Sequence, residues 1–285
     1  MEGESFRPLE LLQRHPKGAL IYYFHKRERL PELTSKLETN FPGRLIVVTP
    51  FQTDFFPADL GTQFNNNFYG YTASQMYVRD SIMEKLQIKE EDLEPLLPNL
   101  RIGEHIEGGQ IVPFANSNIV LFTCPDKDID RYLRVLTSER KIPKNEPYLL
   151  TMLTIFKDLL STPDAEKPFY GTKHIDLLIS GIVGQDRIPI LFIDDFFNRA
   201  VNRSLSKSFP RVRFIPVAHE RVLQGALNIK YLDGKALVTT REIVGEEVIN
   251  NLEQNGIPIV ELGADQFDYY GGPKCRSLDI EWRIP

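Results

Sequence analysis

Cys275 is the residue of this sequence whose setting first suggests chemistry, because it follows two glycines and a proline in GGPKC (271–275). A thiol in such a place is a packing residue, half of a disulfide, or a nucleophile. The 285-residue chain has only two cysteines, which argues against a disulfide scaffold and for a reducing compartment. Positive charge from the adjoining Lys274 favours the reactive thiolate over the neutral thiol. Cys275 is therefore a candidate nucleophile, whereas Cys124 in the apolar run NIVLFTC (118–124) is expected to be a core thiol.

A cysteine nucleophile works with a base and with a group that orients the base. The segment KHIDLLISGI (173–182) places His174 and Asp176 two residues apart at the start of an apolar run. Residues i and i+2 of a strand point to the same face. If this run is a strand from its first residues, imidazole and carboxylate project side by side into one cleft. His174 is then a candidate general acid and base.

Two further acidic positions have the character of functional residues, although each also has an ordinary interpretation. In MYVRDS (76–81) an aromatic, strand-like run ends on Arg79 and Asp80, which could equally form a surface ion pair. In GEHIEGGQIVPF (103–114) Glu107 precedes two glycines at the start of another apolar run. Such glycines allow a close backbone approach or mark a simple bulge. Glu107 itself could equally be an acceptor within a turn.

Four short fragments in chain order resemble one known superfamily. The fragments are VRD (78–80), EGG (107–109), HID (174–176) and GGPKC (271–275). Together they resemble the guanidino-group-modifying superfamily, whose members are called penteins. It includes arginine deiminase, agmatine deiminase, dimethylarginine hydrolase, peptidylarginine deiminase and the amidinotransferases.

The resemblance covers most of the chain. The block from 226 to 262 is similar to the last repeat of arginine deiminase, so the resemblance runs from about residue 76 to the C-terminus. It implies an α/β fold, in which ββαβ units form a pseudo-fivefold propeller around a central channel. It also implies that residues 1–285 form a single domain.

The resemblance implies catalytic roles for three residues. Cys275 would attack the central carbon of a guanidinium group. His174 would protonate the departing amine and then deprotonate a water molecule. Glu107 would orient His174, as a carboxylate does in other catalytic triads.

Four more residues are implied to bind the substrate. Asp80 and Asp176 would accept paired N–H bonds from opposite edges of the guanidinium, and such bonds are strong when they are charge-assisted. Arg79 and Gln110 are the other two. Gln110 stands where arginine deiminases have an acidic residue, a departure that puts free arginine in question as the substrate.

The implied activity is hydrolysis of the guanidinium group of arginine or an arginine derivative. It would run through a covalent thiouronium intermediate and release ammonia or an alkylamine. Two alternatives stay open: an amidinotransferase on the same fold, and a catalytically silent pentein used as a binding module, as the ribosome anti-association factors of this fold are. Neither a cofactor nor a metal is expected, because no His, Cys or Asp cluster has the spacing of zinc ligands.

Composition narrows the setting of this chemistry. The net charge is −5 at pH 7 with no strongly basic block, so nucleic acid is not an expected partner. No apolar run approaches the roughly 20 residues of a membrane-spanning helix, and the first residues lack the apolar core of a signal peptide. With 42% hydrophobic and 26% charged residues, we expect a soluble cytoplasmic protein whose partner is a small guanidino compound.

The elements that would position these residues follow one recurring order of strand, helix and strand. Apolar, β-branched runs alternate with stretches of helical spacing, which is typical of an internally repeated α/β architecture. Three such blocks predict strands at 18–24, 44–50, 188–195, 212–218, 235–240 and 257–262, and helices at 30–41, 196–209 and 246–254. A fourth block begins with a strand at 118–124 and a helix at 128–136.

Two stretches fall outside this pattern. DLGTQFNNNFYGYT (59–72) is rich in Asn, Gly and aromatic residues and is predicted to be a loop, which could act as a lid. IKEEDLEPLLPNL (88–100) is predicted to be a short acidic helix ended by its prolines.

Overall fold

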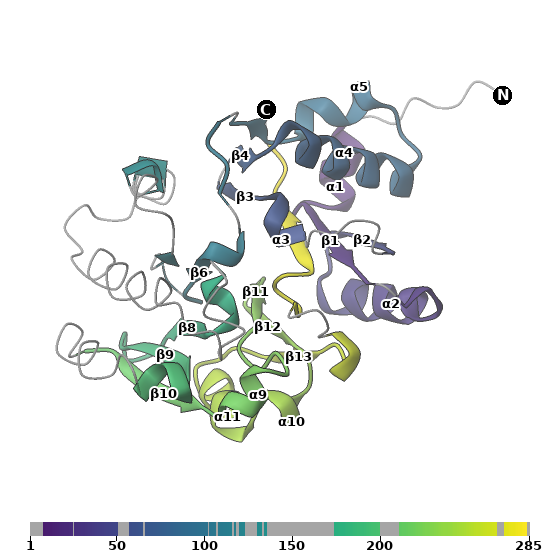
Figure 1. Ribbon diagram of the computed structural model, residues 1–285. Coiled ribbons are helices and arrows are strands. Elements are labelled where there is room, and N and C mark those ends of the chain that lie inside the picture. The colour runs from purple at the N-terminus through teal and green to yellow at the C-terminus, as the bar shows by residue number, and fades with distance from the viewer. Residues whose placement is uncertain are drawn as a thin grey trace. The chain divides into compact units, whose positions relative to one another are not determined.

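The coordinates are a computed structural model of the 285-residue chain. They describe residues 8–24, 26–50, 57–64, 66–101, 103–106, 108–115, 117, 120–122, 130–132, 134–135, 174–199, 211–266 and 271–283. Helices and short strands alternate along these residues, as Figure 1 shows, so the predicted α/β class is confirmed. Within the same residues, no helix combines the length and the apolar character needed to cross a bilayer.

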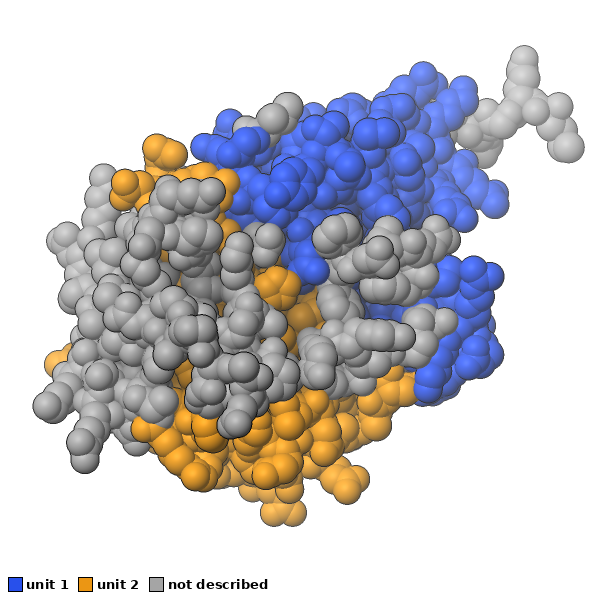
Figure 2. Space-filling view, in the orientation of Figure 1, with its two compact units in different colours: residues 1–107, 276–285 blue, residues 108–275 orange. Residues whose placement is uncertain are grey.

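The chain divides into two compact units, which Figure 2 shows in different colours. Unit 1 comprises residues 1–107 and 276–285, and unit 2 comprises residues 108–275. Each unit has its own hydrophobic core, which includes Ile21 in unit 1 and Phe192 in unit 2. That the whole sequence forms one domain stays a prediction.

The described strands form five small sheets, and four of these share one design. In each of the four, the central strand has an antiparallel neighbour on one side and a parallel neighbour on the other. A parallel pair needs a crossover connection, and helical residues lie within that connection in every case. Three of the sheets are therefore ββαβ units in chain order. Closure of such units around a channel stays a prediction.

The first sheet of unit 1 joins the two ends of the chain. Its elements are α1 (Pro8–Arg14), β1 (Ala19–Tyr23), η1 (Arg27–Arg29), α2 (Leu30–Asn40), β2 (Leu45–Thr49) and β14 (Ser277–Ile280). β1 is buried along its whole length, with β2 parallel on one side and β14 antiparallel on the other. Figure 1 shows α2 beside this sheet, toward which it buries Leu33 and Leu37. The predicted strands at 18–24 and 44–50 and the helix at 30–41 are confirmed.

The second sheet of unit 1 corrects the loop predicted at 59–72. Its elements are α3 (Pro57–Leu60), β3 (Gly61–Phe64), β4 (Asn67–Gly70) and β5 (Asn99–Leu100). β3 and β4 form a hairpin, and β4 also pairs with β5. Phe68 and Tyr69 are 1% and 3% exposed, so burial of two aromatic rings draws this Asn-rich segment into a sheet. The interpretation as a lid thereby loses its basis.

The helix α4 (Thr72–Leu86) replaces the strand-like run predicted at 76–81. Its buried residues recur at helical spacing: they are Ser74, Val78, Ser81 and Ile82. The Tyr and Val of MYVRDS have high β propensity, but that preference yields to the packing of a helical face. After α4, the helices α5 (Glu90–Leu93) and η2 (Glu94–Leu96) confirm the acidic helical segment predicted within 88–100.

Unit 2 begins with a two-stranded hairpin, which is followed by a three-stranded sheet. These elements are η3 (Gly108–Gln110), β6 (Ile111–Pro113), β7 (Val120–Phe122), η5 (Ile175–Leu177), β8 (Ile179–Val183), β9 (Pro189–Asp194) and β10 (Arg213–Val217). Residues 130–132, 134–135 and 195–199 are helical, which agrees with the helices predicted to start at 128 and 196. The strands predicted at 118–124, 188–195 and 212–218 are confirmed where they are described.

The last sheet of unit 2 matches its predicted block closely. Its elements are α9 (His219–Val222), β11 (Lys230–Leu232), β12 (Lys235–Val238), α10 (Arg241–Val244), α11 (Glu246–Gln254), β13 (Ile259–Glu261) and η6 (Ala264–Gln266). The helix α11 has the predicted bounds, and it buries Val248, Ile249 and Leu252. It contacts β13, as expected of the crossover in the parallel pair of β12 and β13.

The pairing of β14 with β1 requires a residue without a side chain at position 18. Its φ is +91°, and a Cβ at this position would lie 2.0 Å from the Ile280 carbonyl oxygen. Gly18→Ala should therefore lower the free energy of unfolding by about 1–2 kcal/mol for its left-handed backbone and by about 1–3 kcal/mol more for overpacking. Urea denaturation measures both contributions together.

The matched control is Gly103→Ala, because Gly103 has a φ of +79° with nothing within 4 Å of the added Cβ. This variant should show the backbone cost alone. Equal losses in the two variants would contradict the register in which β14 passes Gly18.

Candidate active site

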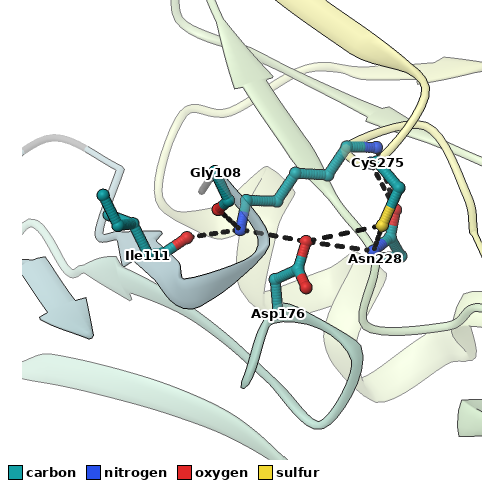
Figure 3. Close-up of polar contacts among 6 residues, drawn as sticks. Gly108, Ile111, Asp176, Asn228 and Cys275 are labelled. Carbon is teal, nitrogen blue, oxygen red and sulfur yellow. Dashed lines mark hydrogen bonds and ion pairs between the residues drawn. The ribbon is translucent and has the colours of Figure 1, made fainter. Parts of the chain in front are cut away.

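Cys275 lies in a turn, as the GGPKC sequence predicts. Residues 273–276 form this turn, and β14 begins directly after it. The side chain is 2% exposed, yet its sulfur has polar partners. Asn228 Nδ2 donates to Sγ at 3.0 Å, and the thiol donates to Asp176 Oδ2 at 3.6 Å, as Figure 3 shows. A thiol that only fills core space needs no such partners, so these contacts favour a nucleophile over a packing residue.

The carboxylate of Asp176 is the centre of this cluster. Asp176 is 0% exposed and lies in η5, all three residues of which are buried. Its Oδ2 is 3.2 Å from Lys274 Nζ, 3.4 Å from Asn228 Nδ2 and 3.6 Å from Cys275 Sγ. Its Oδ1 is buried and has no hydrogen-bond partner among the described residues. Because buried polar atoms normally have partners, Oδ1 is suited to accept an N–H from a ligand.

Lys274 provides the positive charge next to Asp176. Its ammonium also donates to the carbonyl oxygen of Gly108 at 3.3 Å and to that of Ile111. Only 12% of the side chain is exposed. Burial lowers the pKa of Lys274 from its ordinary value, and the nearby negative charge of Asp176 opposes this shift. One oxygen of the Asp176 carboxylate therefore contacts both a cation, the Lys274 ammonium, and the Cys275 thiol.

His174 lies directly before η5 and not in a strand. The strand β8 begins only at Ile179, so the expectation that His174 and Asp176 share one face of a strand is wrong. The tight turn of η5 instead carries Asp176 to its buried ion partner. The imidazole of His174 packs against Gly109, since a Cβ there would lie 2.7 Å from Nδ1 and 2.8 Å from Cγ. Of the two interpretations left open for the paired glycines, a close approach or a simple bulge, Gly109 shows the close approach.

The other predicted site residues have different surroundings. Gln110 is 3% exposed and accepts a hydrogen bond from the Tyr132 hydroxyl. Glu107 lies outside the described residues. Arg79 and Asp80 lie on α4 of unit 1, where Arg79 Nε donates to the 58% exposed Asp80 at 3.1 Å, in the geometry of a surface ion pair. In the described part of the chain, no group of three or more His, Cys, Asp or Glu could hold a metal ion.

Asn228 is the member of the cluster that the sequence interpretation missed. It is 1% exposed, and its Oδ1 accepts the backbone N–H groups of Lys274 at 2.9 Å and Cys275 at 3.1 Å. One signal could have found it. Asn228 interrupts the run ALNI (226–229), whose other residues are at most 2% exposed. A polar residue inside a buried apolar run must find partners, so it is an informative exception.

Comparison with solved structures identifies the fold of the chain. No family model and no curated protein sequence matches the chain. The N-terminal domain of ArgZ, an arginine dihydrolase from the ornithine–ammonia cycle in cyanobacteria, aligns with a TM-score of 0.52 and 10% identity over 92% of this chain and 97% of the domain. Unliganded AgrE aligns with a TM-score of 0.51 and 12% identity over 94% of this chain. The agmatine deiminase of Enterococcus faecalis has a TM-score of 0.45 and 12% identity, covering 95% of each chain.

This chain spans 40% of the length of full-length ArgZ and of AgrE. At identities this low, the likeness concerns the fold alone. The alignments with TM-scores above 0.5 show that the chain has the fold of the guanidino-group-modifying enzymes, the pentein superfamily, and they confirm the resemblance found in the sequence.

Proposed function

We propose that this chain is a cysteine-dependent hydrolase that acts on the guanidinium group of arginine or an arginine derivative. The observation that carries the proposal is the contact of the Cys275 thiol with Asp176, a buried carboxylate one of whose oxygens has no hydrogen-bond partner among the described residues. The thiol is the nucleophile and the open oxygen is an acceptor for the substrate. The two groups lie close enough to act on one small molecule.

A guanidinium group suits this acceptor for electrostatic reasons. It is planar and cationic, and its N–H groups form strong charge-assisted bonds with carboxylates. When a carboxylate and a unit positive charge are about 4 Å apart, their attraction is about 1 kcal/mol in bulk water and about 4 kcal/mol at an effective dielectric of 20. Asp176 is 0% exposed, so its attraction for a bound cation is in the stronger range, reduced by the ammonium of Lys274 at 3.2 Å.

The proposed reaction has two steps. In the first, the thiolate of Cys275 attacks the central carbon, a C–S bond forms, and the amine leaves with a proton from His174. In the second, His174 removes a proton from water, the resulting hydroxide attacks the thiouronium carbon, and the C–S bond breaks to restore the thiolate. The products are a ureido compound and ammonia or an alkylamine. Lys274 and Asn228 lie where they can favour the thiolate.

Fold likeness supports this assignment. The N-terminal domain of ArgZ binds its substrate in a mutant in which a cysteine is replaced by serine. The predicted roles of Glu107 in orienting His174, and of Asp80, Arg79 and Gln110 in substrate binding, belong to the same proposal. A soluble, cytoplasmic location and a small guanidino partner are also part of it.

The proposal is tested by a product screen across arginine, methylarginines, agmatine, acylated arginines and peptidyl arginine. We expect at least one of them to yield a ureido compound, measured by colorimetry together with the released amine. Cys275→Ser should reduce the turnover number by a factor on the order of 10⁶, as removal of the nucleophile does in a serine protease. Cys124→Ser is the control and should retain activity.

Two other outcomes would overturn the hydrolase. Formation of a new guanidino compound when an amine is supplied would indicate an amidinotransferase. No product from any substrate, with Cys275 labelled by a haloacetamidine no faster than free cysteine, would indicate a binding module.

The contact between Gly109 and His174 predicts a second effect on turnover. Gly109→Ala places a methyl group 2.7 Å from Nδ1 and must displace the ring. Because misplacement by about 1 Å can cost about 10²-fold in rate, we expect a loss of that order in the turnover number.

The control is Gly234→Ala, because Gly234 has a φ of +75° and nothing lies within 4 Å of an added Cβ. It should lose stability and keep its turnover number. If Gly109→Ala retains full turnover in a folded protein, His174 is not the acid and base.

A further inference from the structure

Asn228 lies between α9 and β11, on a short connection that brings its side chain to the Cys275 turn. Figure 3 shows the carboxamide beside both the Cys275 thiol and the Asp176 carboxylate. The side chain is buried, at 1% exposed for the whole residue. All of its hydrogen-bonding atoms face this cluster, so it contributes to the site and not to the surface.

The oxygen of this carboxamide fixes the backbone of the nucleophile. Oδ1 accepts the N–H of Lys274 at 2.9 Å and the N–H of Cys275 at 3.1 Å. Two consecutive N–H groups therefore converge on one acceptor. This fixes the local backbone and with it the direction in which the Cys275 side chain projects. An unsatisfied buried N–H is costly, so the turn depends on an acceptor at this position.

The nitrogen of the same carboxamide acts on the sulfur. Nδ2 donates to Sγ at 3.0 Å, and a donor to the charged form of a group stabilises that form. The carboxylate of Asp176, 3.6 Å from Sγ, has the opposite effect because it accepts the thiol proton. Asn228 Nδ2 also donates to Asp176 Oδ2 at 3.4 Å and so reduces the acceptor strength of that oxygen.

Among the described residues, two ammonium groups act on this cluster through their charge. Lys274 is 3.2 Å from Asp176 Oδ2, and Lys230 acts on Lys274 through its charge. Lys274 favours the thiolate, but its ammonium is shared among Asp176 and two carbonyl oxygens. Asn228, by contrast, donates directly to the sulfur.

We propose that Asn228 is the positioning residue of the nucleophile, whose carboxamide oxygen holds the Cys275 turn and whose nitrogen stabilises the Cys275 thiolate. A side-chain amide is suited to both tasks, because it carries an acceptor and a donor at the same distance from the backbone. Aspartate keeps the acceptor but replaces the donor by a negative oxygen. Leucine loses both at nearly the same size. That the thiolate serves guanidinium hydrolysis rests on the proposed function; the effect on the thiol does not.

The test is a pH titration of the Cys275 thiolate by its ultraviolet absorbance, taken as the difference between each protein and its own Cys275→Ser version. Asn228→Asp should raise the thiol pKa by about one to two units, since hydrogen bonds to charged groups are worth that much. The folded structure should remain, because the acceptor for both backbone N–H groups is kept.

The matched control is Asn255→Asp in the same unit. Asn255 Oδ1 also accepts a backbone N–H, from Gln185 at 2.9 Å, and its Nδ2 donates to the Asn251 carbonyl. Asn255→Asp makes the same chemical change away from the sulfur, and it should leave the titration of the Cys275 thiol unchanged. If Asn228→Asp does not fold, Asn228→Leu takes its place and should give a shift in the same direction.

A titration curve of Asn228→Asp or Asn228→Leu that superimposes on the wild type would overturn the proposal. An equal shift in Asn255→Asp would overturn it as well, because the effect would then be one of net charge. Failure of the proposed function would be seen separately. If the thiol titration shifts as expected but the protein turns over no guanidino compound, the role of Asn228 stands and the assignment as a hydrolase is rejected.

Discussion

A carboxylate taken out of water must be matched by donors and positive charge, and Asp176 imposes this requirement on unit 2. It is 0% exposed, and its Oδ2 has Lys274, Asn228 and Cys275 as partners. A buried ion left without its partner is strongly destabilising. The carboxylate therefore draws together three segments that are far apart in the sequence: the η5 turn, the connection before β11, and the turn at 273–276.

This constraint also explains why the cluster is suited to chemistry. Interior carboxylates normally have both oxygens occupied, whereas Asp176 Oδ1 has no partner among the described residues. The donors that satisfy Oδ2 include the thiol itself. A cation that bonds to Oδ1 comes into the vicinity of the sulfur by the same contact. In the proposed reaction, substrate binding and nucleophilic attack would thus depend on one side chain and its neighbours.

Much of the fold could be predicted from local patterns, and the reasons for the failures are physical. Strands such as β1 and β9 are buried along nearly all of their length, so their apolar runs identify them. The helix α4 and the hairpin at 61–70 were misread because their segments were judged by propensity and composition. In both, the burial of particular side chains decides the structure: Val78 and Ile82 in the helix, and the aromatic pair of β4 in the hairpin.

The candidate site divides in the same way. The turn at Cys275 could be anticipated from the GGPKC motif, and the HID motif singled out Asp176, whose role in substrate binding stays a prediction. The ion pair of Asp176 with Lys274 and the side-chain contacts of Asn228 could not, since they join residues 46 or more positions apart along the chain. Local sequence does not encode such contacts; they arise when ββαβ units pack together. Asn228 still left a trace, as a polar residue inside an apolar run.

The proposed reaction requires that the sulfur of Cys275 bonds to the carbon of a guanidinium group. The most direct measurement is mass spectrometry of the Cys275 peptide after rapid acid quenching of the protein with a substrate labelled at that carbon. We expect a labelled amidino adduct on Cys275 that forms and decays during turnover. Turnover without this adduct, or an adduct on a different residue, would contradict it.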